Sequence, residues 1–172
     1  MGCNEFFQTP KSKVCGVISL FISRSNNFDR VTDKYIKKLF LSQPPKSSDA
    51  FYVDNSGEMY LIEFKSGIMD KKEKSGVRLK ICDSLLVLTD ILDKSISYTR
   101  QNLCFILVYD ETKNPRYKIV KRYSRKTKTG EDFDFPLFGF GRFKKLYFKN
   151  VFTVTKDEFE NHFVKKWESA VN

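Results

Sequence analysis

The sequence predicts an α/β fold made of one domain that spans residues 1–172. A chain of 172 residues has the length of one ordinary domain. Hydrophobic residues make up 41% of the chain and aromatic residues 15%, which supplies a core and excludes a disordered protein even though 30% of the residues are charged. Helical and strand patterns alternate along the chain, and no internal repeat or long linker divides it.

The first clear pattern is a helix that begins after Asn27, which, like Ser25, is a suitable N-cap. Six apolar residues fall on one face of this helix: Phe28, Val31, Tyr35, Ile36, Leu39 and Phe40. Pro44 and Pro45 then end it. The preceding apolar run VCGVISLFI, residues 14–22, follows neither a helical nor a strand period, so we expect a buried segment whose type stays open.

Two runs rich in β-forming residues follow, AFYV and MYLIEF, and the turn residues DNSG between them predict a β-hairpin. A charged loop is expected around IMDKKEK. Residues 77–92 are apolar nearly all round, which is typical of a helix packed between two layers. The short apolar run LCFILVY then predicts a fully buried strand.

The last part of the chain predicts a strand and a helix. For residues 113–128 and the stretch FGFGRFKK we expect an edge strand and loops. The run LYFKNVFTV predicts a further strand. Thr155 and Glu158 form a capping box for the last helix. Three aromatic residues lie on one side of that helix: Phe159, Phe163 and Trp167.

The charge of the chain favours a polyanionic partner, and nucleic acid leads the candidates. Thirty-one lysines and arginines against 21 aspartates and glutamates give a net charge of +10. Composition alone does not separate this reading from a basic protein that is merely soluble. Eight of the sixteen residues from 113 to 128 are basic, and we expect them to bind phosphates: Lys113, Arg116, Lys118, Lys121, Arg122, Arg125, Lys126 and Lys128. Tyr117 and Tyr123 could stack on unpaired bases there, and the alternative is an edge strand that lysines protect from aggregation.

The cysteines and the hydropathy pattern predict a cytoplasmic protein without a membrane segment. The four cysteines have no CxxC spacing and His162 is the one histidine, which argues against a zinc site. Three of the four lie in or beside apolar runs, as free cysteines do in a reducing compartment. No apolar run approaches the roughly eighteen residues that a membrane-spanning helix needs.

Asp49, Glu63 and Lys65 are predicted to share one face of the hairpin. Strand residues alternate faces, so Glu63 and Lys65 project to the same side. A three-residue loop that leaves Asp54 opposite Glu58 fixes the remaining register. The resulting pairs are Val53 with Met59, Phe51 with Leu61, and Asp49 with Glu63. Two facing carboxylates repel each other, and oxygen ligands of this kind suit Mg²⁺ or Mn²⁺, which would remove the repulsion.

The pattern of an aspartate, an apolar strand, a turn, a second apolar strand and Glu-x-Lys resembles the PD-(D/E)xK nuclease superfamily, the restriction-endonuclease-like enzymes. The resemblance covers the region from Asn27 to Tyr109. It implies a core of helix, three-stranded β-meander, helix and strand, and therefore a mixed β-sheet flanked by helices. The first strand of that meander has no clear place in the sequence.

The resemblance also implies roles for particular residues. Asp49 and Glu63 would ligate the metal, and the backbone carbonyl of Phe64 would add a third ligand. Lys65 would position or activate the attacking water. Lys80, on the predicted buried helix, corresponds to a basic or amide residue that holds substrate or water in many members.

Two departures from the superfamily pattern stand out. Ser48 replaces the proline of the name, and the first helix offers Asp29 and Asp33 where many members carry a glutamate. The second departure leaves open whether the site holds one metal ion or two.

We therefore expect a metal-dependent nuclease that hydrolyses phosphodiester bonds, with DNA favoured over RNA. The alternative is a catalytically inactive module that keeps the fold and binds nucleic acid or a protein partner. Lys65 would then merely pair with Asp49 or Glu63 at a solvated end of the hairpin. A homodimer or a partner protein stays open as well, since a nuclease domain of this size can depend on either to choose its site.

Overall fold

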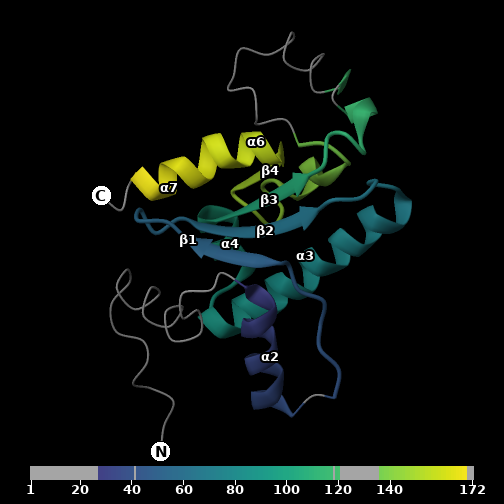
Figure 1. Ribbon diagram of the computed structural model, residues 1–172. Coiled ribbons are helices and arrows are strands. Elements are labelled where there is room, and N and C mark those ends of the chain that lie inside the picture. The colour runs from purple at the N-terminus through teal and green to yellow at the C-terminus, as the bar shows by residue number, and fades with distance from the viewer. Residues whose placement is uncertain (1–26, 41, 118, 121–135, 170–172) are drawn as a thin grey trace, which may run out of the picture.

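A four-stranded mixed β-sheet with helices on both faces forms the centre of the protein, as the computed structural model shows (Figure 1). The structure describes residues 27–40, 42–117, 119–120 and 136–169, so the apolar run at residues 14–22 lies outside it. The strands lie in the order β1 (Ala50–Val53), β2 (Met59–Lys65), β3 (Leu103–Tyr109) and β4 (Asn150–Thr155). The α/β class and the mixed sheet are thus confirmed.

The hairpin has the register that its turn predicts. Strands β1 and β2 are antiparallel, with Val53 opposite Met59 and Phe51 opposite Leu61. The backbone N–H of Asp54 donates to the carbonyl of Glu58 at 3.0 Å, which closes the three-residue loop. Strands β2, β3 and β4 run parallel to one another. Because these three strands run in the same direction, their carboxyl ends lie at the same edge of the sheet.

The outer edge of β1 carries one isolated bridge among the described residues, an antiparallel contact between Asn27 and Ala50. Within the described part of the chain the hairpin therefore has two strands where the family resemblance implies a meander of three. The order of helix, hairpin, helix and strand is otherwise the expected one.

Two apolar layers cover the sheet because alternate strand residues face opposite sides. On one face Phe51, Leu61 and Phe105 pack with Val77 and Ile81 of helix α3 (Lys71–Leu92). The opposite face packs against the last helical segment, and its core comprises Tyr60, Ile62, Cys104, Ile106, Val108, Phe152, Val154 and Phe163. Figure 1 shows α3 and α2 on one side of the sheet and α6 and α7 on the other.

Helix α2 (Phe28–Leu39) begins where the sequence predicts, with the side chain of Asn27 accepting a hydrogen bond from Arg30 N. Its C-terminal end differs from the prediction. Leu39 and Phe40, which we expected on the apolar face, are exposed, and the Phe40 side chain is 95% exposed. Phe40 adopts a left-handed conformation with φ 56°, so it turns out of the helical period and ends the helix.

Helix α3 is longer than predicted, because the charged residues that we assigned to a loop form its first turn. The side chain of Asp70 caps the helix by accepting a hydrogen bond from Glu73 N at 2.8 Å. Asp at an N-cap and Glu in the first turn both stabilise a helix start. This local signal, rather than apolar periodicity, sets where α3 begins.

The predicted edge strand is wrong in the described residues. Residues 115–117 are helical, and FGFGRFKK contains a 3₁₀ turn, η2 (Phe140–Phe143), which buries Phe140 and Phe143 on the sheet. The short helix α4 (Ile96–Asn102), which the sequence analysis missed, precedes β3. Strand β4 starts at Asn150, because residues 145–147 form a turn, closed by hydrogen bonds from Tyr147 N and Phe148 N to Phe143 O.

The last helical segment comprises α6 (Lys156–Phe159), the π-helical turn η3 (Glu160–Val164) and α7 (Lys165–Ser169). The predicted capping box is confirmed: Thr155 Oγ1 accepts from Glu158 N, and Glu158 Oε2 accepts from Thr155 N. Its aromatic residues Phe159, Phe163 and Trp167 pack on the sheet around Tyr60 and Ile62. Across the described residues, no helix has the length and apolar character of a membrane span.

The capping box yields a stability prediction. Replacing Thr155 by Ala removes the acceptor for Glu158 N, and we expect a loss of about 0.5–2 kcal/mol in the free energy of unfolding measured in urea. Lys156→Ala, at the exposed first position of α6, is the control and should change that free energy by less than about 0.5 kcal/mol. Equal effects of the two substitutions would show that the cap does not hold the helix.

Candidate active site

The predicted site residues meet at the carboxyl end of β2, between the sheet and α3. Glu63 and Lys65 alternate with Phe64 along β2 and therefore face the helix, while Phe64 faces the other way and packs edge-on against Phe159. Asp49 comes directly before β1, and Lys80 lies in the middle of α3. The cluster is thus built from the start of β1, the end of β2 and the middle of α3.

Lys80 joins the two carboxylates. Its Nζ lies 2.9 Å from Asp49 Oδ1, 2.9 Å from Glu63 Oε1 and 3.1 Å from Glu63 Oε2. Asp49 and Glu63 therefore lie on the same side of the sheet and share one cation, as the hairpin register predicts. The ammonium group stands between two carboxylates that would otherwise repel each other.

Lys65 forms the second part of the cluster. Its Nζ lies 3.1 Å from Glu63 Oε1 and 3.3 Å from Glu73 Oε2. Sequence analysis missed Glu73, because we read the segment around it as a loop. Recognition of Asp70 as an N-cap would have placed Glu73 in the first turn of a helix that faces β2.

Backbone contacts fix the orientation of Asp49. Its Oδ2 accepts a hydrogen bond from Phe64 N at 2.7 Å, and its carbonyl accepts one from Phe28 N at 3.1 Å. One carboxylate oxygen is thus held by the hairpin, and the other, Oδ1, faces Lys80 and Glu63. The orientation of Asp49 is therefore set by backbone contacts as well as by Lys80.

Ser48, at the position where the superfamily name has proline, makes a backbone hydrogen bond that proline could not make. Its backbone N–H donates to Ser84 Oγ at 2.8 Å, and both residues are fully buried. A proline has no N–H to donate, so proline at this position would leave the Ser84 hydroxyl without that bond. The pair ties the start of the hairpin to α3 directly beside Asp49.

The two acidic residues of α2 do not contact the cluster by any bond that the structure shows. Asp29 accepts a hydrogen bond from Ser47 Oγ, so it anchors the segment before β1 to α2. Asp33 is exposed on α2. The geometry thus gives Asp29 a positioning contact and places both carboxylates of the cluster on the hairpin.

Burial governs the ionisation of the cluster. It raises the pKa of Glu63, whose side chain is 0% exposed, and Asp49 raises it further, while Lys80 and Lys65 act in the opposite direction. Burial acts to lower the pKa of Lys80, but the hydrogen bonds to Glu63 and Asp49 outweigh it, so this pKa lies above its ordinary value. An additional cation would favour the ionised form of Glu63.

The cluster offers two carboxylates as ligands for a hard divalent cation. Asp49 Oδ1 and Glu63 converge on one point that a cation already occupies, since Lys80 Nζ contacts both. The described residues contain no group of three His, Cys, Asp or Glu side chains placed to hold a metal. Two carboxylates completed by waters are a set that Mg²⁺ or Mn²⁺ accepts, whereas Zn²⁺ prefers nitrogen and sulfur ligands.

The expected nucleic-acid-binding residues fall into two groups. Lys113 and Arg116 are described, and both are exposed. Six others lie outside the described residues: Lys118, Lys121, Arg122, Arg125, Lys126 and Lys128. Tyr117 packs against Phe138 with ring centroids 4.1 Å apart, so at least one face of its ring is taken by the protein; Tyr123 lies outside the described residues.

Comparisons with known proteins give no family for the chain: no protein-family model, no curated protein and no solved structure matches it. The cluster of Asp49, Glu63, Lys65 and Lys80 is therefore the feature from which a function has to be argued.

The ionisation of Glu63 gives a pH-dependent prediction. A carboxyl whose pKa is raised by folding stabilises the protein most below its unfolded pKa, and this contribution is lost as the pH rises through the folded pKa. Glu63→Gln removes the buried charge, so in EDTA its unfolding free energy should match the wild type near pH 4 and exceed it near pH 8. Urea unfolding at both pH values measures this.

The stability of Glu63→Gln also depends on the ion pairs that Lys80 and Lys65 keep. In Glu63→Gln, Lys80 keeps Asp49 and Lys65 keeps Glu73 as partners, so neither ammonium group is left unpaired. A variant that is less stable than the wild type at pH 8 would show that the ion pairs outweigh the burial of the Glu63 charge.

Proposed function

We propose that the protein is a Mg²⁺-dependent nuclease of PD-(D/E)xK type that hydrolyses phosphodiester bonds in DNA. One observation supports this most directly: the carboxylates of Asp49 and Glu63 lie on the same side of the sheet, close enough for both to contact Lys80 Nζ, with the Lys65 ammonium 3.1 Å from Glu63. This is the set of residue types that phosphodiester hydrolysis needs, namely ligands for a divalent ion and a base or orienting cation beside them.

In this proposal Asp49 and Glu63 hold the metal ion, with the Phe64 carbonyl as a further ligand. A bound Mg²⁺ ion would polarise the phosphoryl oxygen and lower the pKa of water. The protein contributes orientation, because the hydrogen bond from Phe64 N fixes Asp49 and burial fixes Glu63.

Lys65 has the position expected of a residue that orients the attacking water. Its ammonium group is partly exposed and held between Glu63 and Glu73, so one donor remains for a third partner on the open side. Lys80 would contact the phosphate once a metal ion has taken over the carboxylates. Both lysines would then stabilise charge that develops on the phosphoryl oxygens.

The fold supports the proposal at the level of element order. Helix α2, the hairpin β1–β2, helix α3 and the parallel strand β3 follow the order that the superfamily implies, except that the described residues form a two-stranded hairpin in place of the three-stranded meander. The site also lies at the carboxyl ends of parallel strands, where ligands bind in open α/β sheets. A fold of this kind is compatible with many functions, so the cluster carries the argument.

The alternative function is an inactive module of the same fold that binds nucleic acid or a protein partner. The contact of Lys80 with both carboxylates favours it, because this lysine already neutralises the pair without a metal ion. The two functions differ in whether added Mg²⁺ displaces the ammonium group.

Cleavage tests the role of Lys65. Labelled single-stranded, duplex and branched DNA should be cut by the wild type with Mg²⁺ or Mn²⁺ and not with EDTA. Lys65→Ala should keep DNA binding and most of its metal affinity, while turnover falls by about two orders of magnitude or more, as happens when a general base or an interaction of the transition state is removed. Glu63→Gln should lose both metal affinity and cleavage.

Lys38→Ala is the matched control, since it removes one lysine from the exposed end of α2 and should cut like the wild type. If the wild type binds these DNAs but cuts none of them, or cuts equally well in EDTA or as Lys65→Ala, the protein is not a metal-dependent nuclease and the binding module takes its place.

Lys80→Met separates the two functions by stability. Without the ammonium group Asp49 loses this cation and Glu63 keeps Lys65 as its partner, so in EDTA the variant should lose about 1–3 kcal/mol of unfolding free energy, between the values for exposed and buried ion pairs. Mg²⁺ at about one hundred times its dissociation constant should return about 2.7 kcal/mol. A melting temperature that stays constant over a Mg²⁺ titration, for both wild type and Lys80→Met, would count against a metal site.

A further inference from the structure

A concave surface lies beside the candidate active site, in the part of the fold that follows β2 and β3. It encloses about 550 Å³ between the loop that leads into α3 and the segment after β3. Its cations are Lys74, Lys113 and Arg116, and its apolar side chains include Ile68, Tyr117 and Val120. We call this cavity the basic groove.

The basic groove has a rigid frame. Asn114, which is 4% exposed, accepts a hydrogen bond from Met69 N at 2.8 Å and donates from Nδ2 to the carbonyls of Gly67 and Asp110. This single amide joins the two loops that form the walls. A groove held in this way is formed before a ligand arrives, which lowers the entropic cost of binding.

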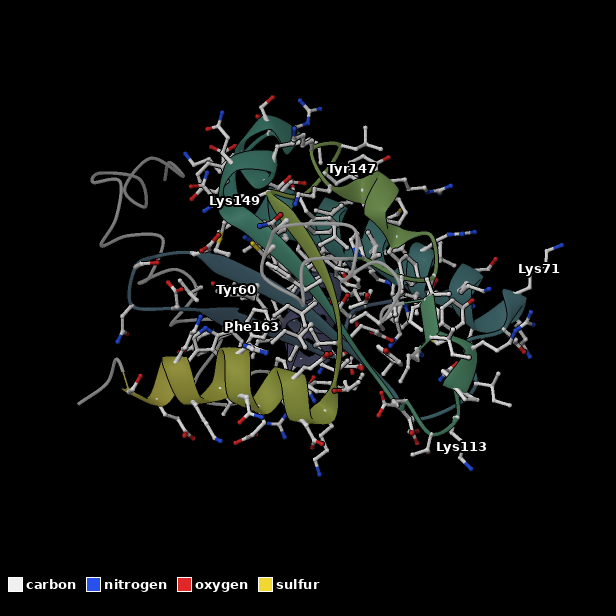
Figure 2. All side chains as sticks on the ribbon, turned by 90° about the horizontal axis from the view of Figure 1, so that it is seen from above. Tyr60, Lys71, Lys113, Tyr147, Lys149 and Phe163 are labelled. Carbon is white, nitrogen blue, oxygen red and sulfur yellow. The ribbon has the colours of Figure 1, made fainter. Side chains whose placement is uncertain are left out.

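The basic groove lies close to the cluster of Asp49, Glu63, Lys65 and Lys80, at a distance that a few nucleotides of a DNA strand can span. Met69 follows Lys65 by four residues, so their Cα atoms are separated by at most about 14 Å. Asp110 N also donates to the Lys65 carbonyl at 3.0 Å, which ties the segment after β3 to the end of β2. Figure 2 shows Lys113 and Lys71 in the same half of the molecule, away from Tyr60, Lys149 and Phe163.

Charge and polarity in the basic groove point to one ligand chemistry. Three of the described lining residues are cations and none is an acid. Ile68 is 64% exposed and Val120 is 44% exposed, so apolar surface faces the same space. A nucleotide combines an anionic phosphate with an apolar base face, and proteins that bind single strands pair cations with apolar or aromatic platforms in this way.

We propose that the basic groove binds an unpaired nucleotide of a DNA strand, on the flank of the phosphodiester that the candidate active site would cleave. In a duplex the base faces are stacked on their neighbours, so they cannot contact Ile68 and Val120 inside a concave surface. This proposal depends on the proposed nuclease function for the cleavage step, whereas the binding of the nucleotide is independent of it. It assigns single-stranded or branched DNA as the preferred substrate class.

The first experiment measures how many phosphates the basic groove neutralises. Fluorescence anisotropy of a labelled oligo-dT with full-length Glu63→Gln in EDTA reports binding without cleavage. In that background Lys113→Ala/Arg116→Ala should weaken binding and reduce the salt slope, d log K/d log [salt], by about 1.4, or about 0.7 for each phosphate that is no longer neutralised. The control Lys37→Ala/Lys38→Ala removes the same charge from exposed positions on α2 and should keep the slope.

The second experiment measures the base contact. An abasic strand of equal length carries the same phosphates, so the difference between oligo-dT and the abasic strand isolates the base. Glu63→Gln should bind oligo-dT roughly five-fold or more tightly than the abasic strand, and Ile68→Ser should lose most of this preference without changing the salt slope. Ile68 is exposed, so the substitution leaves the core intact.

Three results would overturn the proposal: equal slopes for the groove and control variants, equal binding of the oligo-dT and abasic strands, or tighter binding of a matched duplex than of oligo-dT. Because binding is measured in EDTA, its failure is distinct from a failure of the nuclease proposal. If the wild type cleaves DNA and the groove variants bind like the wild type, the proposal for the basic groove is wrong and the nuclease proposal stands. If binding depends on the groove but the wild type does not cleave DNA, the nuclease proposal is wrong and the groove proposal stands.

Discussion

The burial of one carboxylate governs the arrangement of the site. Glu63 lies two residues before the end of β2, its same-face neighbours Met59 and Leu61 are fully buried in the core, and its own side chain has no access to water. A buried charge of this kind is costly unless a partner lies beside it, and Lys80 and Lys65 supply that partner. The position of α3 over the sheet therefore serves both the apolar core and the ion pairs.

The helix can meet both demands because of its period. Val77 and Ile81, which are fully buried, hold α3 on Phe51 and Leu61, and Lys80 lies one residue before Ile81. Its Cα therefore sits about 100° around the helix from the buried residue, at the border of the apolar face. From that border a long side chain can reach the end of β2 while its stem stays against the core.

The sequence was sufficient for the hairpin and for most helices, and the reason is local. The loop after Asp54 fixes the register of β1 and β2, and with it the side on which Asp49 meets Glu63. The contact of Lys80 with both carboxylates had no such local signal, and the family resemblance suggested Lys80 only as a residue that holds substrate or water. The spacing of residues in the sequence does not predict which strand of the sheet a buried helix will pack across.

The failures share a physical cause as well. Glu73 was missed because a run of charges reads as a loop, although Asp70 offers a cap. The region that contains η2 was expected to form an edge strand and loops; it forms a 3₁₀ turn instead, and its phenylalanines pack onto the sheet around Phe105. In both cases tertiary contacts or capping decided between conformations that apolar pattern alone does not separate. The basic residues from 121 to 128 lie outside the described part of the chain, so the predicted phosphate contacts there stay a prediction.

The π-helical turn in the last helical segment bears on how that segment is aligned. Phe159, Phe163 and Trp167 are spaced four residues apart, and in a regular α-helix each such step rotates a side chain about 40° past a full turn. Over two steps the third ring would have moved well off the line of the first. The turn η3, with its wider hydrogen-bonded ring, lies between Phe159 and Trp167 and takes up part of this rotation. The three aromatic rings, which would form a broad stripe on a regular α-helix, are thereby aligned more closely along one face of the sheet.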